Sequence, residues 1–497
     1  MYKPTFEEFI QKARQGNLIP VYKEVLADLE TPVSAYMKIR QESYSFLLES
    51  VQGGERWARY CFLGCNPSTI IRLRGRKITV QKNGVVEEKT ISAENPLEGL
   101  KEILSRYKPA PTPDLPRFAG GAVGFISYDM ARFFERLPNQ AADDLDMPDA
   151  LFMTTDTLLI FDNVYQTIKI VSNAFVENDD LEGLYRSAIG KIEAIEEKLR
   201  QNVPEVSLPI PPDEAAYTPR FESNFKKEDF IKAVRKIKQY IMEGDVIQTV
   251  LAQRLKLKIT RDPFDIYRAL RAINPSPYMY FLSFGEFQIV GSSPEALVRQ
   301  EGRLVENRPI AGTRRRGKSE DEDLELEREL LKDEKELAEH IMLVDLGRND
   351  LGRIAEPSTV EVNEKFLIER YSHVMHIVSN VRCVLKKGYD CFDVLKAAFP
   401  AGTVSGAPKI RAMEIIDELE PTRRGLYAGA VGYISFTGNM DTAIAIRTLV
   451  IKDKTAYLGI GAGIVADSDP EREFEETMNK GKALLKAIQL AERGLAL

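Results

Sequence analysis

The second half of the sequence is a series of predicted strands followed by predicted helices, and this order limits the possible folds more than any other feature. An alternating stretch from Ile247 to Ile259 predicts a long, half-buried strand. Apolar runs at 278–284, 287–290 and 296–300 predict three more strands. Helical patterns follow over about 323–346 and after residue 470. Because strand and helix do not strictly alternate, we expect an α+β fold rather than a doubly wound one.

Two proline-rich stretches divide the chain, and the longer runs from Asn202 to Arg220. It follows a charged helical segment at about 180–201. It precedes an amphipathic helix whose apolar residues recur at helical spacing: Phe230, Val234, Ile237 and Ile241. We therefore expect an N-terminal region over 1–220 that ends in this linker, and a catalytic region over 221–497.

One segment is nearly repeated in the two halves: Gly121-Ala-Val-Gly-Phe-Ile-Ser-Tyr128 returns as Gly429-Ala-Val-Gly-Tyr-Ile-Ser-Phe436. Glycine inside a strand usually marks the close approach of another backbone. The repeat suggests equivalent strands in the two halves, with chance similarity of an apolar strand as the alternative.

The composition excludes several classes of function. The 497 residues include 68 Lys and Arg against 75 Asp and Glu, a net charge of -7. Such a balance predicts no binding to nucleic acid or to a membrane surface. Neither a signal peptide nor an apolar run long enough to span a bilayer is apparent, so we expect a soluble cytoplasmic protein. The four cysteines form no Cys-x-x-Cys pair and are expected to be reduced thiols.

Two predicted helices carry carboxylates that could hold a cation. In the C-terminal helix, Glu473, Glu476 and Lys480 fall within about 60° of one another. In the predicted helix over 323–346, Glu339 lies where a charged face meets an apolar one. A carboxylate from each helix suits Mg²⁺ bound to an oxyanionic substrate. A solvated charged flank and ordinary helical ion pairs are the alternatives.

Two further segments could bind anions. Gly459-Ile-Gly-Ala-Gly463 reads as a loop that presents backbone N–H groups, although it lacks the Gly-x-Gly-x-x-Gly spacing of a dinucleotide site. Arg314-Arg-Arg316 precedes an acidic run from Glu320 to Glu329 and reads most simply as a solvated loop.

Taken together, these segments closely resemble the chorismate-utilising enzymes. The resemblance covers about 221–490 and rests on five segments: Pro309 to Arg314, Glu336 to Asp350, Phe399 to Pro408, Gly459 to Asp467, and Glu473 to Lys480. The N-terminal part resembles the regulatory region of the anthranilate synthase branch through Leu47-Leu-Glu-Ser50, with Asn274-Pro-Ser-Pro-Tyr-Met279 later in the chain. The implied fold has large antiparallel sheets packed as a β-sandwich core with helices outside.

The resemblance also implies a binding site. Glu339 and Glu476, with Glu473 adjoining, would hold Mg²⁺ against the ring carboxylate of chorismate. The residues implied to grip the substrate are Gly312, Thr313, Tyr427, Arg447, Gly461, Ala462, Gly463 and Lys480. A divalent cation, a guanidinium and fixed N–H groups suit a dianion that gains charge during elimination.

Two positions distinguish branches of the family by nucleophile. Water-adding members carry a lysine base where this chain has Gln248, and glutamine cannot remove a proton from water. Aminodeoxychorismate synthases typically carry a nucleophilic lysine where this chain has Ala311. Ammonia is therefore the implied nucleophile, which gives anthranilate and pyruvate. Glu295 matches the general acid for the departing hydroxyl, while His376 and Thr403 match further catalytic positions.

The resemblance implies feedback inhibition by tryptophan at a site built from both halves. Glu49 would meet the amino group and Ser50 would hydrogen-bond, while Pro277, Tyr278 and Met279 would line the indole. No glutamine amidotransferase motif is apparent, so a separate amidotransferase subunit is implied, in a heterotetramer of two large and two small subunits. The alternatives are an aminodeoxychorismate or aminodeoxyisochorismate synthase component and a non-catalytic tryptophan-sensing protein.

Overall fold

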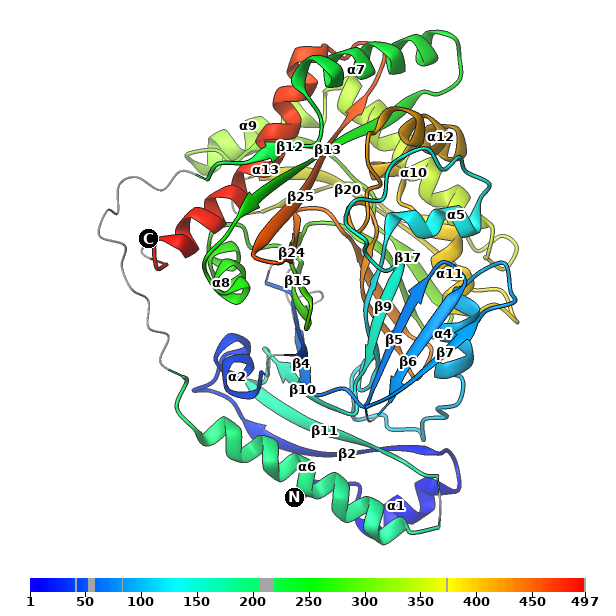
Figure 1. Ribbon diagram of the computed structural model, residues 1–497, viewed down its shortest axis with the longest axis vertical. Coiled ribbons are helices and arrows are strands. Elements are labelled where there is room, and N and C mark those ends of the chain that lie inside the picture. The colour runs from blue at the N-terminus through cyan, green and yellow to red at the C-terminus, as the bar shows by residue number, and fades with distance from the viewer. Residues whose placement is uncertain are drawn as a thin grey trace.

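The computed structural model describes residues 1–40, 43–51, 59–82, 84–177, 179–204, 219–371 and 374–495. Two large antiparallel sheets face each other across an apolar interior, with helices on their outer sides (Figure 1). The expected α+β sandwich is therefore confirmed. The boundary near residue 220 stays a prediction, because residues 205–218 of the predicted linker lie outside the described residues.

The first sheet has thirteen strands. In spatial order they are β1 (Tyr2–Lys3), β2 (Leu18–Leu26), β11 (Thr167–Phe175), β10 (Thr157–Asp162), β4 (Tyr60–Cys65), β3 (Tyr44–Glu49), β14 (Tyr278–Phe284), β15 (Phe287–Ser293), β24 (Thr448–Lys452), β25 (Thr455–Ile464), β13 (Gln248–Lys258) and β12 (Glu222–Ser223), with β21 (Gly406–Ala407) on the start of β13.

The second sheet has twelve strands. Their order is β18 (Ile310–Arg315), β20 (Val374–Val384), β17 (Leu304–Asn307), β16 (Ala296–Glu301), β23 (Met440–Ile444), β22 (Ala430–Ser435), β8 (Gly121–Ile126), β9 (Ala150–Thr154), β5 (Thr69–Arg74), β6 (Lys77–Lys82) and β7 (Val85–Thr90), with β19 (Glu361–Arg370) paired to β20.

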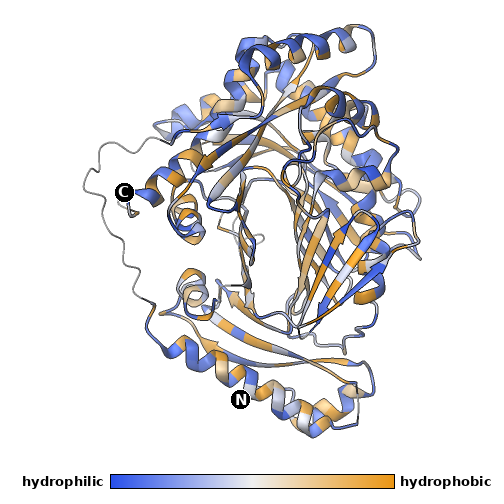
Figure 2. Cartoon of the chain, viewed as in Figure 1, coloured by the Kyte–Doolittle hydropathy of each residue, from blue (hydrophilic) through white to orange (hydrophobic). Residues whose placement is uncertain are grey.

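Helices cover the outer faces of both sheets. Against the first sheet lie α1 (Phe6–Ala13), α2 (Pro32–Ile39), α6 (Leu181–Arg200), α8 (Pro263–Ile273) and α13 (Pro470–Glu492). The remaining helices are α4 (Leu97–Leu104), α5 (Ala131–Phe134), α7 (Lys227–Met242), α9 (Glu320–Leu330), α10 (Glu334–Gly352), α11 (Cys391–Ala398) and α12 (Lys409–Leu419), with 3-10 turns η1 (Tyr128–Met130) and η2 (Gly402–Val404). Figure 2 shows hydrophilic residues concentrated on these outer helices. Among the described helices, none combines the length and the apolarity needed to cross a bilayer.

Strands from the two halves of the chain lie side by side in both sheets. In the first sheet β3 pairs with β14, and Glu49 lies opposite Met279. In the second sheet β8 pairs with β22, so that Gly124 lies opposite Gly432. The two copies of the repeated segment are thus strands in equivalent positions, as expected, and they lie next to each other in one sheet. These pairings close a common interior between the halves.

Two sequence expectations need correction. The single helix over 323–346 is two helices: α9 ends at Leu330, and Asp333 caps the start of α10 by accepting hydrogen bonds from the N–H groups of Lys335 and Glu336. The first half of β13 is buried on both faces rather than on one, while alternation begins only near Arg254. Ile247 precedes the strand and is 63% exposed.

We expect Gly124→Ala to destabilise the protein. A Cβ at this position would lie 2.0 Å from the carbonyl oxygen of Leu151, and backbone cannot give way as a side chain can. The free energy of unfolding in urea should fall by about 1–3 kcal/mol, as for other overpacked positions. The matched control is Gly190→Ala in α6, where nothing lies within 4 Å; it should be neutral or stabilising by up to ~1 kcal/mol. Equal stability of both variants would contradict the close approach.

Candidate active site

Glu295 lies in the link between β15 and β16 and is 7% exposed. Its backbone carbonyl accepts a hydrogen bond from the N–H of Ile444 in β23, at 3.0 Å. Burial raises the pKa of the Glu295 carboxyl to about 8, and the Thr403 side chain in η2 opposes that rise. The buried Thr403 hydroxyl makes no hydrogen bond of normal geometry within the described chain. A carboxyl that keeps its proton at neutral pH can act as a general acid.

His376 lies on β20 opposite Thr313 of β18. Its Nδ1 is 3.0 Å from the carbonyl oxygen of Gly312 and 3.1 Å from the Thr313 hydroxyl. Because a carbonyl only accepts, we assign the proton to Nδ1, which leaves a lone pair on Nε2. Burial lowers the pKa of the imidazole, the hydrogen bond to Gly312 opposes this, and Arg447 lowers the pKa further. Gly312 sits in a bulge of β18 with a φ of +68°.

The glycines at 459–463 belong to strand β25, so the expected loop is wrong. Because these glycines have no side chains, they leave room for the side chains of Tyr427 and Gln248. A Cβ on Gly459 would lie 2.3 Å from the side chain of Tyr427, and one on Gly461 would lie 2.5 Å from the Tyr427 hydroxyl. A Cβ on Gly463 would lie 2.3 Å from Nε2 of Gln248. Glycine is thus required here by packing against Tyr427 and Gln248, not by a turn.

Two cations lie where β25 meets α13. The Arg447 guanidinium donates to the backbone carbonyl of Lys480. The Lys480 ammonium donates to the carbonyl of Gly461 at 3.0 Å and pairs with Glu476 at 2.7 Å. Burial lowers the pKa of Arg447, while Tyr427 and Glu476 oppose that change. This arrangement suits an anionic ligand that can replace some of these contacts.

Carboxylates from α10 and α13 face the same region. Burial raises the pKa of Glu339, and the charges of Glu336 and Glu476 add to the rise. Burial also raises the pKa of Glu473, and one of its carboxylate oxygens is buried without a hydrogen-bond partner in the described chain. A hard divalent cation would offset the repulsion among these carboxylates and would give the unsatisfied oxygen of Glu473 a partner. Among the described residues, no three His, Cys, Asp or Glu side chains are close enough together to bind one metal ion.

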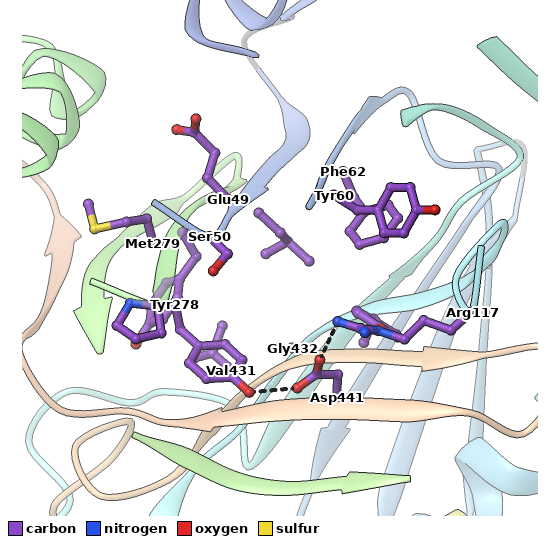
Figure 3. Close-up of a pocket in the computed structure, with 14 residues that line it drawn as sticks. Glu49, Ser50, Tyr60, Phe62, Arg117, Tyr278, Met279, Val431, Gly432 and Asp441 are labelled. Carbon is purple, nitrogen blue, oxygen red and sulfur yellow. Dashed lines mark hydrogen bonds and ion pairs between the residues drawn. The ribbon is translucent and has the colours of Figure 1, made fainter. Parts of the chain in front are cut away.

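A second pocket lies between the halves, and we call it the seam pocket (Figure 3). It encloses about 530 Å³, part of it open to solvent. It is lined by Leu48, Glu49, Ser50, Tyr60, Phe62, Arg117, Pro277, Tyr278, Met279, Tyr280, Val431, Gly432, Tyr433 and Asp441. All five residues predicted for an inhibitor site therefore line one pocket.

The carboxylate of Glu49 is already paired. It accepts hydrogen bonds from Tyr267 and from Nε of Arg271, at 3.1 Å for the latter, and its side chain is 1% exposed. Figure 3 shows this carboxylate turned away from Ser50 and Tyr278. An amino group in the seam pocket would have to compete with Arg271 for Glu49.

The sequence matches a family described as chorismate binding enzyme over residues 44–486. The anthranilate synthase component 1 of Acetivibrio thermocellus is 51% identical over 99% of both chains. The chain belongs to the chorismate-binding enzymes, in the anthranilate synthase component 1 group.

Further relatives of this family agree. The anthranilate synthase component 1 of Pseudomonas aeruginosa is 49% identical over 98% of this chain and 99% of its own. The solved structure of anthranilate synthase component I from Streptococcus pneumoniae is 38% identical, with a TM-score of 0.76 over 93% of this chain and 99% of its own. A menaquinone-specific isochorismate synthase from Escherichia coli, at 20% identity and a TM-score of 0.70, covers 97% of this chain and 98% of its own and shows the fold alone.

The residues expected from the family resemblance fall into two places. The seam pocket holds the five inhibitor-site residues. The residues expected to act in catalysis or to bind substrate lie on the elements described above, where the buried Ala462 completes the glycine-rich part of β25. Gln248 is buried at the start of β13, and its amide oxygen has no hydrogen-bond partner in the described chain.

The residues of the seam pocket that sequence reasoning missed include three polar ones, Arg117, Tyr433 and Asp441. Arg117 donates from Nε to the Tyr433 hydroxyl at 2.9 Å and pairs with Asp441 at 3.2 Å. Asp441 also accepts a hydrogen bond from Tyr278 at 3.0 Å. None of the three lies in a recognisable motif, although Tyr433 belongs to the repeated segment.

The expectation of a solvated loop at 314–316 is wrong. Arg314 lies in β18 and pairs with Glu329, Asp333 and Glu336 at 2.9, 2.7 and 3.1 Å. Arg316 pairs with Asp323. The acidic run in α9 and the start of α10 thus neutralise this basic segment and hold α10 against β18.

We expect Glu295→Gln to change the pH dependence of stability. The unfolded carboxyl releases its proton near its ordinary pKa of 4.5, whereas the buried one keeps it until about pH 8. The parent should therefore lose stability as pH rises from about 4.5 to 8, by up to ~1.4 kcal/mol per pKa unit, and the variant should not. Urea unfolding at pH 5 and pH 8 measures this difference. The exposed Glu475→Gln serves as control and should behave as the parent; a parental slope in Glu295→Gln would contradict the assignment.

Proposed function

We propose that the chain converts chorismate and ammonia to anthranilate and pyruvate, as the large component of an anthranilate synthase. The observation that carries the proposal is the buried Glu295, which keeps its proton at neutral pH. Three residues before it, the Ser292 N–H donates to the carbonyl of Arg447, whose guanidinium donates to the backbone carbonyl of Lys480 on α13. An acid for a leaving hydroxyl and cations for a dianion are what this elimination needs.

The nucleophile follows from two buried side chains. Gln248 has no basic atom, so it cannot activate water, and Ala311 cannot form a covalent adduct. Free ammonia attacks at ring carbon 2 while the Glu295 carboxyl donates its proton to the hydroxyl that leaves carbon 4. The Thr403 hydroxyl, which has no full partner in the described chain, can hydrogen-bond Glu295 once it is charged.

Substrate binding is assigned to residues around β25. Arg447, Tyr427 and Lys480 would bind the carboxylates of chorismate, together with backbone groups of Gly461, Ala462 and Gly463. Support comes from the pairing of β25. β24 reaches only the start of β25, and among the described strands none pairs with the rest of β25 on that side. Gly312 and Thr313 would contact the substrate from the bulge in β18, where Gly312 has a positive φ.

His376 is proposed to move a proton during loss of pyruvate. Its Nδ1–H is held by the Gly312 carbonyl, and its lowered pKa keeps Nε2 unprotonated at neutral pH. A neutral, oriented imidazole can accept the ring proton whose loss restores aromaticity.

Glu339, Glu473 and Glu476 are proposed to hold Mg²⁺, since the raised pKa values of Glu339 and Glu473 and the unsatisfied oxygen of Glu473 fit a cation. When bound, Mg²⁺ supplies positive charge for a substrate carboxylate. Lys480, now paired with Glu476, would then be released toward the substrate.

The component 1 group implies a partner component. We propose a glutamine amidotransferase subunit that supplies unprotonated ammonia, in a heterotetramer of two large and two small subunits. The free cysteines, three of them buried, fit a reducing compartment, and we place the reaction in the cytoplasm.

The central test is turnover by the purified chain. With chorismate, Mg²⁺ and an ammonium salt, we expect fluorescent anthranilate and an equal amount of pyruvate, and glutamine should replace ammonium only after the partner subunit is added. An amino product without pyruvate would indicate an aminodeoxychorismate or aminodeoxyisochorismate synthase component instead. Absence of any product under these conditions would leave only the tryptophan-sensing alternative.

Removing a proposed metal ligand should abolish most activity. Chelation of Mg²⁺ should stop turnover reversibly, and Glu339→Gln or Glu476→Gln should lower kcat by about 10²–10³, the usual cost of losing a charged transition-state contact. The matched control is Glu475→Gln on α13, which is exposed and is not among the proposed ligands. Full activity of the Glu476 variant would remove it from the site.

We further propose that the seam pocket binds tryptophan as a feedback inhibitor. The pocket joins Ser50 at the end of β3 to Tyr278 at the start of β14, and in the β14–β15 hairpin Tyr278 lies opposite Ser293, two residues from Glu295. A ligand here can therefore bias the position of the general acid through one strand pair.

Ser50→Ala should weaken inhibition without stopping catalysis. Loss of one hydrogen bond should raise the tryptophan concentration for half-inhibition roughly tenfold, while kcat stays within about twofold of the parent. Ser43→Ala, an exposed residue just before β3, is the control. Unchanged inhibition of the Ser50 variant would exclude this hydroxyl from the inhibitor site.

A further inference from the structure

A buried ion pair lies among the elements of the proposed active site. Glu420 directly follows α12, and Arg424 comes four residues later. Their side chains are 5% and 2% exposed, and the guanidinium donates to both carboxylate oxygens, at 2.6 and 2.9 Å. A charge pair this deeply buried is costly unless both groups have further hydrogen-bond partners.

Those partners lie on a stretch of the β13 edge with which none of the described strands pairs. β21 pairs with the first two residues of β13, and β12 pairs farther along the strand. Between them, the carbonyl of Val250 accepts a hydrogen bond from Arg424 at 2.9 Å, and the N–H of Ala252 donates to Glu420 at 2.9 Å. Arg424 and Glu420 thus take the place of a neighbouring strand at the Val250 carbonyl and the Ala252 N–H.

The same guanidinium holds two other parts of the site. It donates to the carbonyl of Val404 at 2.6 Å, one residue after Thr403. It also lies over the ring of Tyr427, with 5.5 Å between the guanidinium carbon and the ring centre, and over the ring of Tyr128 at 4.6 Å.

We propose that Arg424, held by Glu420, is a positioning residue that fixes three active-site parts relative to one another: Thr403, Tyr427 and the strand that begins with Gln248. It acts through these residues and needs no contact with the substrate. Lysine cannot replace it, since a single ammonium cannot reproduce the planar fork that serves two carbonyls and a carboxylate. The role in turnover rests on the proposed function, whereas the structural arrangement does not.

The kinetic test compares Arg424→Lys and Arg424→Met with a matched control. Asp417→Asn breaks another buried ion pair on α12, that of Asp417 with Arg132 at 2.6 Å, which touches none of the proposed catalytic residues. We expect kcat to fall at least tenfold in Arg424→Lys and further in Arg424→Met. The control should stay within twofold of the parent even if it loses as much thermal stability. Glu420→Gln, which keeps the shape of the side chain, should give a smaller fall in the same direction and serves if the Met variant does not fold.

The pH profile separates positioning from simple destabilisation. Thr403 opposes the rise in the pKa of Glu295 that burial causes. Displacing Thr403 should therefore raise that pKa further, and the loss of kcat at alkaline pH should move to higher pH in the Arg424 variants. A variant that is only destabilised, such as Asp417→Asn, should have a kcat at most twofold lower across the pH range, and its pH profile should not move.

Hydrogen exchange provides a readout that needs no activity. In Arg424→Met, the amides at 250–252 and 404–405 should exchange at least tenfold faster than in the parent, while the control should not differ there. Parental kcat, pH profile and exchange in the Arg424 variants would overturn the positioning role. If the parent itself makes no anthranilate, the proposed function fails, and the exchange result alone decides whether Arg424 holds these segments.

Discussion

The pairing of β3 with β14 is the interaction on which the rest of the structure depends. It joins a strand from the first fifty residues to a hairpin of the catalytic region and so makes the first sheet continuous. The pairing of β8 with β22 does the same for the second sheet. Because the apolar cluster between the sheets is lined from both halves, that cluster is complete only when both pairings are made.

Charge distribution follows from this architecture. The interior between the sheets is mainly apolar, and ion pairs neutralise many of the charged side chains around it. The acidic residues of α9 and α10 neutralise the basic segment in β18. The carboxylates of Glu339 and Glu473 are left without such cations, and their raised pKa values show the cost. A chain of net negative charge can therefore present a site for a dianion and a divalent metal together.

Features set by local sequence could be predicted. The strand over 278–284, the amphipathic helix that contains Phe230 and Val234, and the helix after residue 470 depend on alternation and helical spacing within a few residues. The family resemblance then brought together the five residues that line the seam pocket.

Features set by distant partners could not be predicted. Asp333 divides a helical pattern while it pairs with Arg314. The glycines of β25 looked like a loop because the side chain that requires two of them, Tyr427, lies outside the segment. The pairing of Glu49 with Arg271 joins residues more than two hundred positions apart, and neither position carries a pattern that reveals it.

The backbone around Glu295 lies in the same ladders as the walls of the seam pocket. On one side, β15 ends opposite Tyr278; on the other, β23 carries Asp441 at the pocket and bonds the Glu295 carbonyl through Ile444. If the seam pocket binds tryptophan as proposed, feedback sensitivity and the acid strength of Glu295 are not independent traits in evolution, because a change in the spacing of either strand alters both. Substitutions of pocket residues outside those ladders, such as Arg117 and Tyr60, would change the affinity for the proposed inhibitor without changing the surroundings of Glu295.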